Sequence, residues 1–464
     1  MRTHWRGGLR LAVVALSVAA VGLAGVPASG QAASTVRINE VESNGGSPGD
    51  WVELVNTGTA AVDVSGWVVK DNDNSHTFTL GSGTSLAPGG HIALDVDPVY
   101  GLGSTDSARL YLAGGSTLVD TYTWSSHATT TYGRCADGTG AFTTTAAPTK
   151  GAANACPLPT SAWPGSQSVA FADGTNVFGT NLSGLAYQGT GVVWAVKNGP
   201  STLYRLVPNG TTWRPDPAGG WSAGKALNYA NGSGDPDTEG VVSTPDGVFA
   251  ATERDNDNSG TSLQKIVRFD VDSPAGSLNA TGEWNLTADL PSSAANSGLE
   301  AISWVPDTFL TARGFRDERT GAAYNPANYA GHGSGLYVVG LESNGAAYVY
   351  ALTLSGSGYT RIATMPTGFS SVMDLEFEPE TGHLWAYCDN TCSGRASTLD
   401  IDAQGKFAAT AVYNRPTGMS NYNNEGFAIA PQAACVGGQK QVLWADDSND
   451  SSHALRSGTL PCNP

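Results

Sequence analysis

One short motif recurs along the C-terminal two-thirds of the chain, and this recurrence restricts the fold more than any other feature. Four copies place a glutamate before a small or apolar residue and a strand-like run, and a fifth copy has serine instead. The copies are Asn181-Leu-Ser183-Gly184, Asp237-Thr-Glu239-Gly240, Gly298-Leu-Glu300-Ala301, Asp374-Leu-Glu376-Phe377 and Asn423-Asn-Glu425-Gly426. A β-rich pattern repeated every 49 to 76 residues predicts a β-propeller, in which each repeat is one radial sheet.

A second strand follows each motif, and polar residues stand where that strand ends. These second strands are expected at Val192–Val196, Val248–Thr252, Phe309–Ala312, Leu384–Tyr387 and Val442–Ala445. Five repeats are evident, and the long interval between Glu300 and Glu376 has room for another. We therefore favour six blades, with five as the alternative, and expect Gln167–Phe171 to add an outer strand that closes the ring with the last blade.

The four glutamates of the motif predict an acidic ring. Equivalent positions in successive blades lie at equivalent radii, so Glu239, Glu300, Glu376 and Glu425 should meet near the central channel. Carboxylates so close together need a cation, basic side chains, protons or water. A hard cation such as Ca²⁺ fits an all-oxygen ligand set. The competing interpretation is a structural polar channel, in which the acids pair with Lys, Arg and backbone amides.

The polar residues after the second strands are candidates for catalysis. Acidic ones could complete a metal shell or act as a base, and basic ones could bind an anionic substrate. The acids are Glu253, Asp389, Asp446 and Asp447, and the bases are Lys197, Arg254 and Arg313. No G-x-S-x-G or H-E-x-x-H pattern occurs. His332 lies in a glycine-rich insertion, where a solvent-exposed loop histidine is expected.

Residues 1–33 have the pattern of an export signal, with three arginines before an apolar stretch and small residues after it. We therefore expect a secreted monomer with no membrane span. The formal charge of −17 disfavours nucleic acid as a partner. Six cysteines suit an oxidising compartment, and proximity in the sequence suggests the pairs Cys135–Cys156, Cys388–Cys392 and Cys435–Cys462.

Residues 34–156 show short alternating strands and frequent turns, the pattern of a small β-sandwich. The segments Ile38-Asn-Glu40-Val, Asp50-Trp51-Val-Glu53-Leu-Val-Asn56, Val64-Ser-Gly66-Trp67 and Pro148-Thr-Lys-Gly151-Ala-Ala-Asn154 resemble the lamin tail domain. That resemblance implies an immunoglobulin-like sandwich. In it, Glu53 is expected on the solvent face of its strand. Residues 157–166, with two prolines, are interpreted as a short stiff linker.

The propeller region, residues 167–464, resembles the phytase-like esterase family in its blade entries Asp237-Thr-Glu239-Gly240, Gly298-Leu-Glu300-Ala301 and Asn424-Glu425-Gly426-Phe427. The resemblance implies a hydrolase. The first hypothesis is thus a secreted, calcium-dependent hydrolase of phosphate or carboxylic esters, acting on a small anionic or ester substrate. The alternative is a non-catalytic protein that binds glycan, peptide or cell-wall polymer through exposed aromatic residues such as Trp213, Trp221 and Tyr229.

Overall fold

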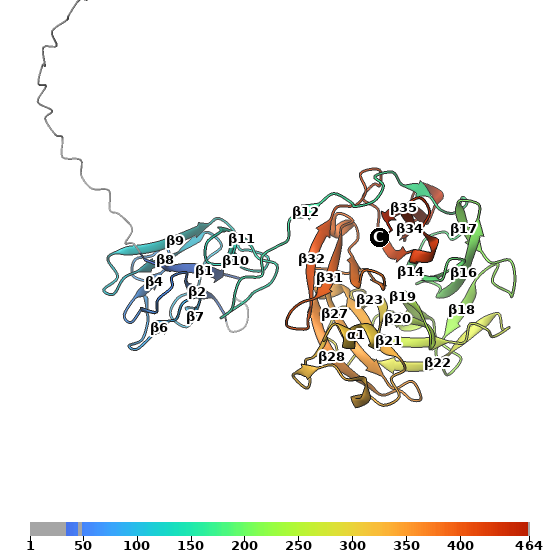
Figure 1. Cartoon of the computed structure of the whole chain (residues 1–464), viewed down its shortest axis with the longest axis horizontal. Coiled ribbons are helices and arrows are strands. Elements are labelled where there is room, and N and C mark those ends of the chain that lie inside the picture. The colour runs from blue at the N-terminus through green and yellow to red at the C-terminus, as the bar shows by residue number, and fades with distance from the viewer. Residues whose placement is uncertain (1–33, 45–48, 463–464) are drawn as a thin grey trace, which may run out of the picture. The chain divides into compact units, whose positions relative to one another are not determined.

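The computed structural model describes residues 34–44 and 49–462, and the chain divides into two units between Cys156 and Pro157. The expected signal peptide, residues 1–33, lies outside the described residues. None of the helices found in the described part of the chain is long and apolar enough to cross a membrane. Both units are built from β-strands, as the sequence predicts (Figure 1).

The first unit is a β-sandwich of two main sheets. One sheet has the order β11-β10-β1-β2-β7, and the other has the order β5-β4-β8-β9. A small β3-β6 pair is attached to them. The bounds are β1 (Val36–Glu42), β2 (Trp51–Asn56), β3 (Val62–Asp63), β4 (Val68–Lys70), β5 (Phe78–Thr79), β6 (Ser85–Leu86), β7 (His91–Asp95), β8 (Asp106–Tyr111), β9 (Leu118–Trp124), β10 (Tyr132–Cys135) and β11 (Ala141–Thr144). Branched residues such as Ile38, Leu54 and Leu110 fill the space between the sheets.

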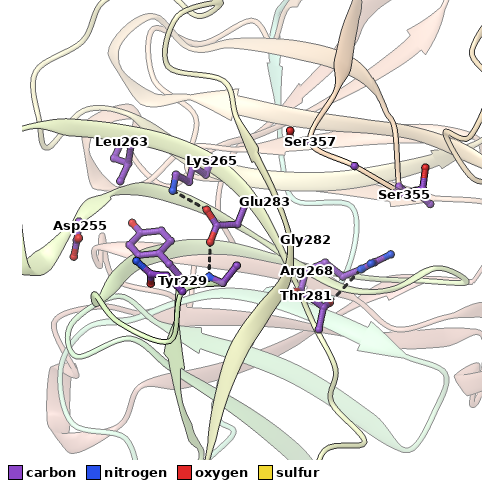
Figure 2. A pocket seen from close by; sticks show the side chains of 14 residues that line it. Tyr229, Asp255, Leu263, Lys265, Arg268, Thr281, Gly282, Glu283, Ser355 and Ser357 are labelled. Carbon is purple, nitrogen blue, oxygen red and sulfur yellow. Dashed lines mark hydrogen bonds and ion pairs between the residues drawn. The ribbon is translucent and has the colours of Figure 1, made fainter.

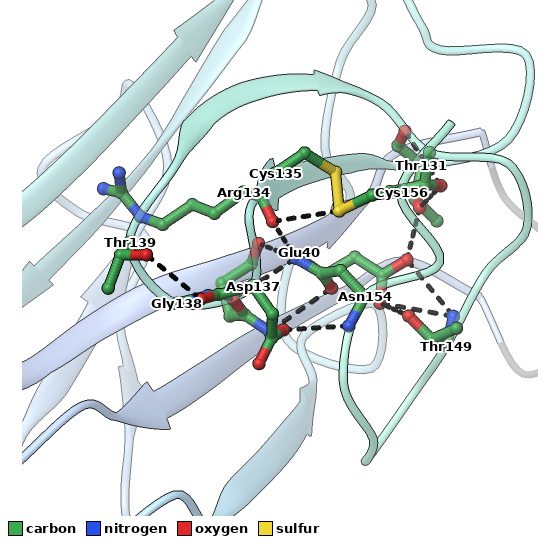
Figure 3. The surroundings of a disulfide bond; sticks show 12 residues. Glu40, Thr131, Arg134, Cys135, Asp137, Gly138, Thr139, Thr149, Asn154 and Cys156 are labelled. Atoms are coloured by element: carbon green, nitrogen blue, oxygen red, sulfur yellow. Dashed lines mark hydrogen bonds between the residues drawn. A yellow bond between two sulfur atoms is a disulfide. The ribbon is translucent and has the colours of Figure 1, made fainter. Parts of the chain in front are cut away.

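Glu53 corrects one expectation about this sandwich, because it is fully buried rather than on a solvent face. The segment that closes the domain covers the outer side of β2, and Glu53 accepts hydrogen bonds there from Asn39 Nδ2 (2.9 Å) and the Gly151 amide. Figure 3 shows the same segment beside the Cys135–Cys156 disulfide, with Asn154 on Asp137. The amide-rich motif of this domain therefore fastens its last segment to β1 and β2.

The second unit is a β-propeller. The inner strands β14, β19, β23, β29 and β33 follow one another round the ring, and β33 lies beside β14. The described residues thus form five blades (Figure 1). The first two blades contain β14 (Leu182–Gln188), β15 (Val192–Lys197), β16 (Thr202–Asn209) and β17 (Thr212–Pro215), then β19 (Pro236–Thr244), β20 (Gly247–Asp255), β21 (Ser262–Phe269) and β22 (Ser277–Asn285). Strand β18 (Lys225–Asn228) pairs with β16 and β22 and so joins these two blades.

The other three blades have the same order from the channel outward. They contain β23 (Leu299–Pro306), β26 (Gly335–Leu341), β27 (Ala346–Leu352) and β28 (Tyr359–Pro366), then β29 (Asp374–Glu378), β30 (His383–Tyr387), β31 (Ala396–Ile401) and β32 (Phe407–Tyr413), and finally β33 (Asn424–Ile429), β34 (Gln439–Asp446), β35 (Leu455–Pro461) and β13 (Ala170–Phe171). Short 3₁₀ turns are η1 (Asn256–Asn258), η2 (Pro326–Asn328), η3 (Glu342–Asn344), η4 (Asn390–Cys392), η5 (Gln432–Ala434) and η6 (Asp450–Ser452).

The favoured count of six blades is wrong, and the alternative of five is confirmed. The long interval after Glu300 holds an insertion within the third blade and no separate blade. The insertion consists of α1 (Asp307–Ala312), the hairpin β24 (Arg316–Asp317) and β25 (Ala322–Ala323), and η2. It packs inward: His332 is 6 % exposed and lies 2.9 Å from Asp307 Oδ2 and 3.1 Å from the Tyr324 hydroxyl. His332 is therefore a buried residue and not the expected exposed one.

The ring closes as the sequence predicts. Strand β13 pairs antiparallel with β35 and supplies the outer strand of the last blade. Residues 157–166, interpreted above as a linker, also contribute to the propeller unit: β12 (Thr160–Ser161) pairs with β32, and the buried Trp163 donates its indole N–H to the Thr459 carbonyl at 3.0 Å. All three suggested disulfides are confirmed: Cys135–Cys156, Cys388–Cys392 and Cys435–Cys462.

The small residue after the motif glutamate has a structural reason. A Cβ added to Gly240 would lie 2.8 Å from the Glu300 carbonyl oxygen on the next inner strand. The same holds for Gly184, 2.5 Å from the Glu239 carbonyl oxygen, and for Gly426, 2.3 Å from the Ser183 carbonyl oxygen. These distances are too short for a side chain, so glycine lets neighbouring inner strands approach one another. The motif thus encodes the narrow ring as well as the carboxylates.

Candidate metal centre in the propeller

Glu239, Glu300 and Glu425 each stand at an irregularity in the pairing of an inner strand. The register between first and second strand shifts between Thr238 and Gly240, between Leu299 and Ala301, and between Asn424 and Gly426. Each shift leaves the glutamate without a partner residue on the neighbouring strand, as in a β-bulge. A bulge changes the direction of a side chain relative to the alternating pattern of a regular strand. The three glutamates are therefore positioned by the same local device in three blades.

The bulges bring carboxyl groups together at the end of the channel where the inner strands begin. Asp237, Glu239 and Glu253 form one group of possible ligands, and Glu253, Glu300 and Glu342 form a second. In each group, one oxygen from every residue lies within 4.8 Å of the others. Glu253 belongs to both groups and links them. We call these five residues, together with Glu425, the acidic cluster.

The hydrogen bonds of the acidic cluster leave acceptor capacity unused. Glu253 accepts the Gly298 amide at 2.7 Å, and Glu239 accepts Asn198 Nδ2 at 3.2 Å. Glu300 is only 6 % exposed, yet it has neither a hydrogen bond nor an ion pair with the described residues. Glu425 Oε2 and Asn198 Oδ1 are also buried without a hydrogen-bond partner. Buried polar oxygens in that state are uncommon in folded proteins and point to a missing partner.

The raised pKa values of the acidic cluster also indicate that most of its carboxyl groups lack a positively charged partner among the described residues. Burial raises the pKa of Glu239, Glu300 and Glu425 well above the ordinary range, and neighbouring carboxylates raise it further. Burial also raises the pKa of Glu253 to about 7 and that of Asp237 to about 6. Without a cation, several of these groups hold a proton at neutral pH, because burial and like charge both disfavour the ionised form.

Glu376 does not lie with the other three motif glutamates. In two other blades an alanine of the second strand, Ala251 or Ala445, pairs with the glycine that follows the motif glutamate. The equivalent alanine in the blade of Glu376 is Ala386, and it pairs with Leu375, the residue before Glu376. Asp374 therefore occupies the equivalent position in β29. Its carboxylate accepts the amides of Phe427 (2.7 Å) and Leu375 (2.8 Å). Glu376 lies two residues further along the strand.

The residues expected after the second strands separate into two sets. Asp447 and Asp389 are close enough to Glu425 to raise its pKa. Burial raises the pKa of Asp447 itself, and Asn423 and Lys197 oppose that rise. Asp389 also accepts the Thr391 amide at 2.9 Å. Asp446 is on the other side of its strand, fully buried and 3.0 Å from Arg456 Nη2. It belongs to a structural ion pair rather than to the acidic cluster.

The two predicted arginines also differ in position. Arg254 lies at the acidic cluster, with Nε 2.6 Å from Asp237 Oδ2 and Nη1 3.7 Å from Glu253 Oε2. Arg313 is exposed at the C-terminal end of α1, over the Phe309 ring. Residues Phe309–Ala312, expected to be the second strand of this blade, are helical. Arg313 is therefore not at the end of a second strand and does not reach the channel. That strand is instead β26.

Two members of the acidic cluster were missed by sequence reasoning. Glu342 directly follows β26, the second strand of its blade, and Glu253 lies near the end of the second strand of the preceding blade. An apolar run followed by an acid, Leu336-Tyr-Val-Val-Gly-Leu-Glu342, is the sequence pattern that could have identified it. Asp237 stands two residues before Glu239 inside the recurring motif. Its side chain reaches the cluster because the register also shifts between Pro236 and Thr238.

The residues present fit a hard divalent cation. All donors are carboxylate or amide oxygens, with no thiol or imidazole among them, which suits Ca²⁺ or Mg²⁺ rather than a softer metal. Six carboxyl groups face two basic side chains, Arg254 and Lys197, so pairing within the protein does not neutralise the cluster. A cation would also satisfy the buried Oε2 of Glu425.

A cavity of about 750 Å³ lies elsewhere, at the outer strands β21 and β22 of the second blade. Two of its charged residues, Lys265 and Glu283, form an ion pair. Lys265 Nζ lies 2.8 Å from Glu283 Oε2 and over the Tyr229 ring (Figure 2). Trp213, Trp221 and Tyr229 are at most 6 % exposed, so the expectation that they form an exposed aromatic binding surface is wrong.

Comparison with known proteins identifies the first unit only. The family model of the Lamin Tail Domain matches residues 29–126. No curated protein matches the chain. Similar solved structures include a protein of unknown function from Bacteroides caccae (9 % identity, covering 58 % of this chain and 80 % of that one, TM-score 0.29). A functionally unknown protein from Desulfotomaculum acetoxidans DSM 771 has 10 % identity, coverage of 60 % and 69 %, and a TM-score of 0.30.

A chain of a Mitotic Checkpoint Complex crystal structure is similar at 10 % identity over 97 % of this chain and 100 % of that one, with a TM-score of 0.31. These structural likenesses are too weak to carry an argument about function, and none of the comparisons shows the resemblance of the propeller to the phytase-like esterase family. The chain thus carries a lamin tail domain at residues 29–126, followed by a five-bladed propeller.

Proposed function

We propose that the chain is a secreted, metal-dependent hydrolase of phosphate or carboxylic esters, whose propeller holds a divalent cation, Ca²⁺ foremost, in the acidic cluster. The observation that carries the proposal is that two groups of possible carboxylate ligands share Glu253. Glu300, in the second group, is buried and has no hydrogen bond to the described residues. Secretion is supported by three disulfides in a chain with no free cysteine among its described residues.

Glu253 would hold the cation together with Asp237 and Glu239 or with Glu300 and Glu342, the two groups that it links, and Glu425 lies near them. A bound divalent cation polarises an ester or phosphoryl oxygen and lowers the pKa of water. Burial raises the pKa of Asp237 to about 6, and the Arg254 guanidinium beside it opposes that rise. Asp447 and Asp389 lie beside Glu425 and are the carboxylates that could accept a proton from water.

Lys197 is the basic residue placed to meet a substrate anion. It is close enough to Asp447 to oppose the rise in pKa that burial causes there, and within the described residues its ammonium donates to the Phe178 carbonyl alone, at 3.2 Å. The guanidinium of Arg254 is more constrained, since Nη1 donates to Ala295 and Asn296 in addition to the Asp237 ion pair. We therefore assign substrate attraction to Lys197 and positioning of Asp237 to Arg254.

The test is thermal unfolding in EDTA and then with Ca²⁺, Mg²⁺ or Mn²⁺, alongside turnover of model phosphate and carboxylic esters. Because only the folded state has the cluster, a cation at 100 times its Kd should stabilise the fold by about 2.7 kcal/mol. Glu239→Gln with Glu300→Gln should remove most of that stabilisation and all cation-dependent turnover. Glu283→Gln with Glu318→Gln, outside the cluster, is the matched control and should keep both.

Two results would contradict the proposal. If no divalent cation changes the melting temperature of the wild-type protein, the carboxyl groups are protonated or paired internally and the metal assignment is wrong. If a cation stabilises the fold but no ester is turned over, the metal centre stands and the hydrolase assignment does not.

A further inference from the structure

The channel has a second end, and it forms a small cavity. The acidic cluster lies where the inner strands begin, whereas this cavity of about 240 Å³ lies where they end. Every blade contributes to it, through Tyr187, Val242, Trp304, Phe377 and Ile429 among others. Since all five inner strands run in the same direction along the channel, the two sites are at opposite ends. We call this second site the distal cavity.

The lining of the distal cavity combines aromatic rings with carboxyl groups. Tyr187, Trp304 and Phe377 supply the rings, and Glu376, Glu378 and Glu380 supply the acids. Among the described residues, no lysine, arginine or histidine lines the cavity. The nearby Lys440 is 1 % exposed and forms an ion pair with Glu378, so it is not available to a ligand. The cavity is therefore negative and partly apolar, which disfavours anions.

Glu376 is the polar group that the fold leaves for a ligand. Within the described residues it has no ion pair, and its one hydrogen-bond partner is the Ile429 amide. Burial raises its pKa well above the ordinary range, with Asp374 and Glu378 raising it further and Lys440 lowering it. Burial raises the pKa of Tyr187, and the nearby Glu376 raises it further. The Tyr187 hydroxyl donates a hydrogen bond to Gln441 Oε1 at 2.9 Å. A carboxyl held by one amide still has acceptor positions free.

We propose that the distal cavity binds a small organic cation, with an ammonium group on Glu376 and its carbon chain against Tyr187, Trp304 and Phe377. Aromatic faces attract a cation, and a carboxylate in a cavity of low polarity pairs with it strongly. At about 240 Å³ the cavity is below the roughly 300–1,000 Å³ of sites for drug-sized ligands. A short alkylamine or the end of an aminoalkyl side chain is the size of ligand it suits.

Binding should be accompanied by loss of a proton. Burial raises the pKa of Glu376 in the free protein, and an ammonium group placed against it favours the carboxylate. The alkylamine keeps its own proton, because its ordinary pKa is near that of lysine, about 10.4. Any proton lost by Glu376 on binding goes to the buffer, so calorimetry in two buffers of different ionisation enthalpy should detect net proton release.

The experiment uses the full mature chain in EDTA, so that divalent cations do not contribute, and isothermal titration at pH 7. The probes are butylammonium, its neutral isostere butan-1-ol, and butyrate. We expect butylammonium to bind at least ten times more tightly than butan-1-ol, and butyrate not to bind. Glu376→Gln should abolish this preference together with the proton release. The change keeps the size and shape of the side chain, so the melting temperature should be retained.

Two further variants keep the test decisive. Glu380→Gln removes an exposed charge from the same cavity and should change the affinity less than twofold. Trp304→Leu should weaken butylammonium binding several-fold while the preference over butan-1-ol persists. Equal affinity for amine and alcohol, or equal losses in Glu376→Gln and Glu380→Gln, would overturn the proposal. Because the titration omits divalent cations, its outcome does not depend on the metal centre.

Discussion

The residues that decide the chemistry of the propeller are buried acids whose pKa values are raised. For such a group the folded state binds a proton more tightly than the unfolded chain. Its contribution to stability is complete below the unfolded pKa of about 4.3 and is lost as the pH rises through the folded value. For Glu253 that folded value is about 7, so the relevant window is about pH 4 to 7. A bound cation reverses the preference, since it requires the ionised form.

The pH dependence of stability should therefore have opposite signs with and without metal. In EDTA the melting temperature of the propeller should fall between pH 5 and 8, and the stabilisation by Ca²⁺ should grow over the same range. Glu253→Gln should reduce the loss in EDTA by on the order of 1–3 kcal/mol, because it removes one titrating group. Thermal unfolding at several pH values, in EDTA and with Ca²⁺, measures the melting temperature without metal and the stabilisation by the cation. A melting temperature that rises with pH in EDTA would show that the cluster is ionised without a cation.

At the scale of elements, the ring depends on how closely the inner strands approach. Gly240 faces the backbone of β23, where an added Cβ would lie 2.7 Å from the Ile302 amide nitrogen and 2.8 Å from the Glu300 carbonyl oxygen. Backbone atoms cannot move aside without opening the ring. The same strands carry Glu239 and Glu300, so the spacing of the blades also sets the spacing of the carboxylates.

Gly240→Ala should therefore destabilise the propeller by about 1–3 kcal/mol, the usual cost of overpacking, and should weaken cation binding as well. The matched control is Gly276→Ala, at a turn where an added Cβ would meet nothing within 4 Å. Chemical denaturation and calcium titration of both variants check this. Unchanged stability in Gly240→Ala would mean that the inner strands have room that the structure does not show.

The third blade shows why its second strand was misplaced. Pro306 ends β23, and the next six residues form α1, with Asp307 in its first turn and Leu310 buried. A negative residue in the first turn favours a helix. A short apolar run such as Phe309-Leu310 fits either a helix or a strand, so periodicity alone does not separate the two. The insertion then returns the chain to β26 and places Glu342, not Arg313, at the channel.

At the scale of the whole molecule, two features hold the ends of the propeller together. Strand β13, near the start of the unit, pairs with β35, near its end. The Cys435–Cys462 disulfide ties the C-terminal segment back to the loop before β34. A ring closed in this way resists opening because its first and last strands belong to one sheet.

Removing that disulfide should affect the propeller alone. Cys435→Ser with Cys462→Ser should lower its free energy of unfolding by about 2–4 kcal/mol, the typical contribution of a disulfide. Cys135→Ser with Cys156→Ser is the matched pair in the other unit and should destabilise the lamin tail domain instead. Hydrogen exchange followed by mass spectrometry reports on each unit separately. Equal loss of protection in both units for either variant would contradict this assignment.

Sequence patterns alone predict the all-β class, the propeller, its closing strand, the disulfide pairs and four members of the acidic cluster. These features are local or periodic: alternating strands, a recurring glutamate-glycine pair and cysteines close in sequence. The lamin tail domain was also recognisable from its motifs, and its family model matches residues 29–126.

The number of blades and the full membership of the site depend on contacts between residues far apart in the sequence. Shifts in register place Glu239, Glu300 and Glu425 at bulges, whereas β29 has no shift and carries Asp374 to that position. A displacement of two residues along a strand moves a side chain to a different level of the channel. Glu376 therefore lines the distal cavity, because strand pairing, which depends on distant residues, sets where each carboxylate lies.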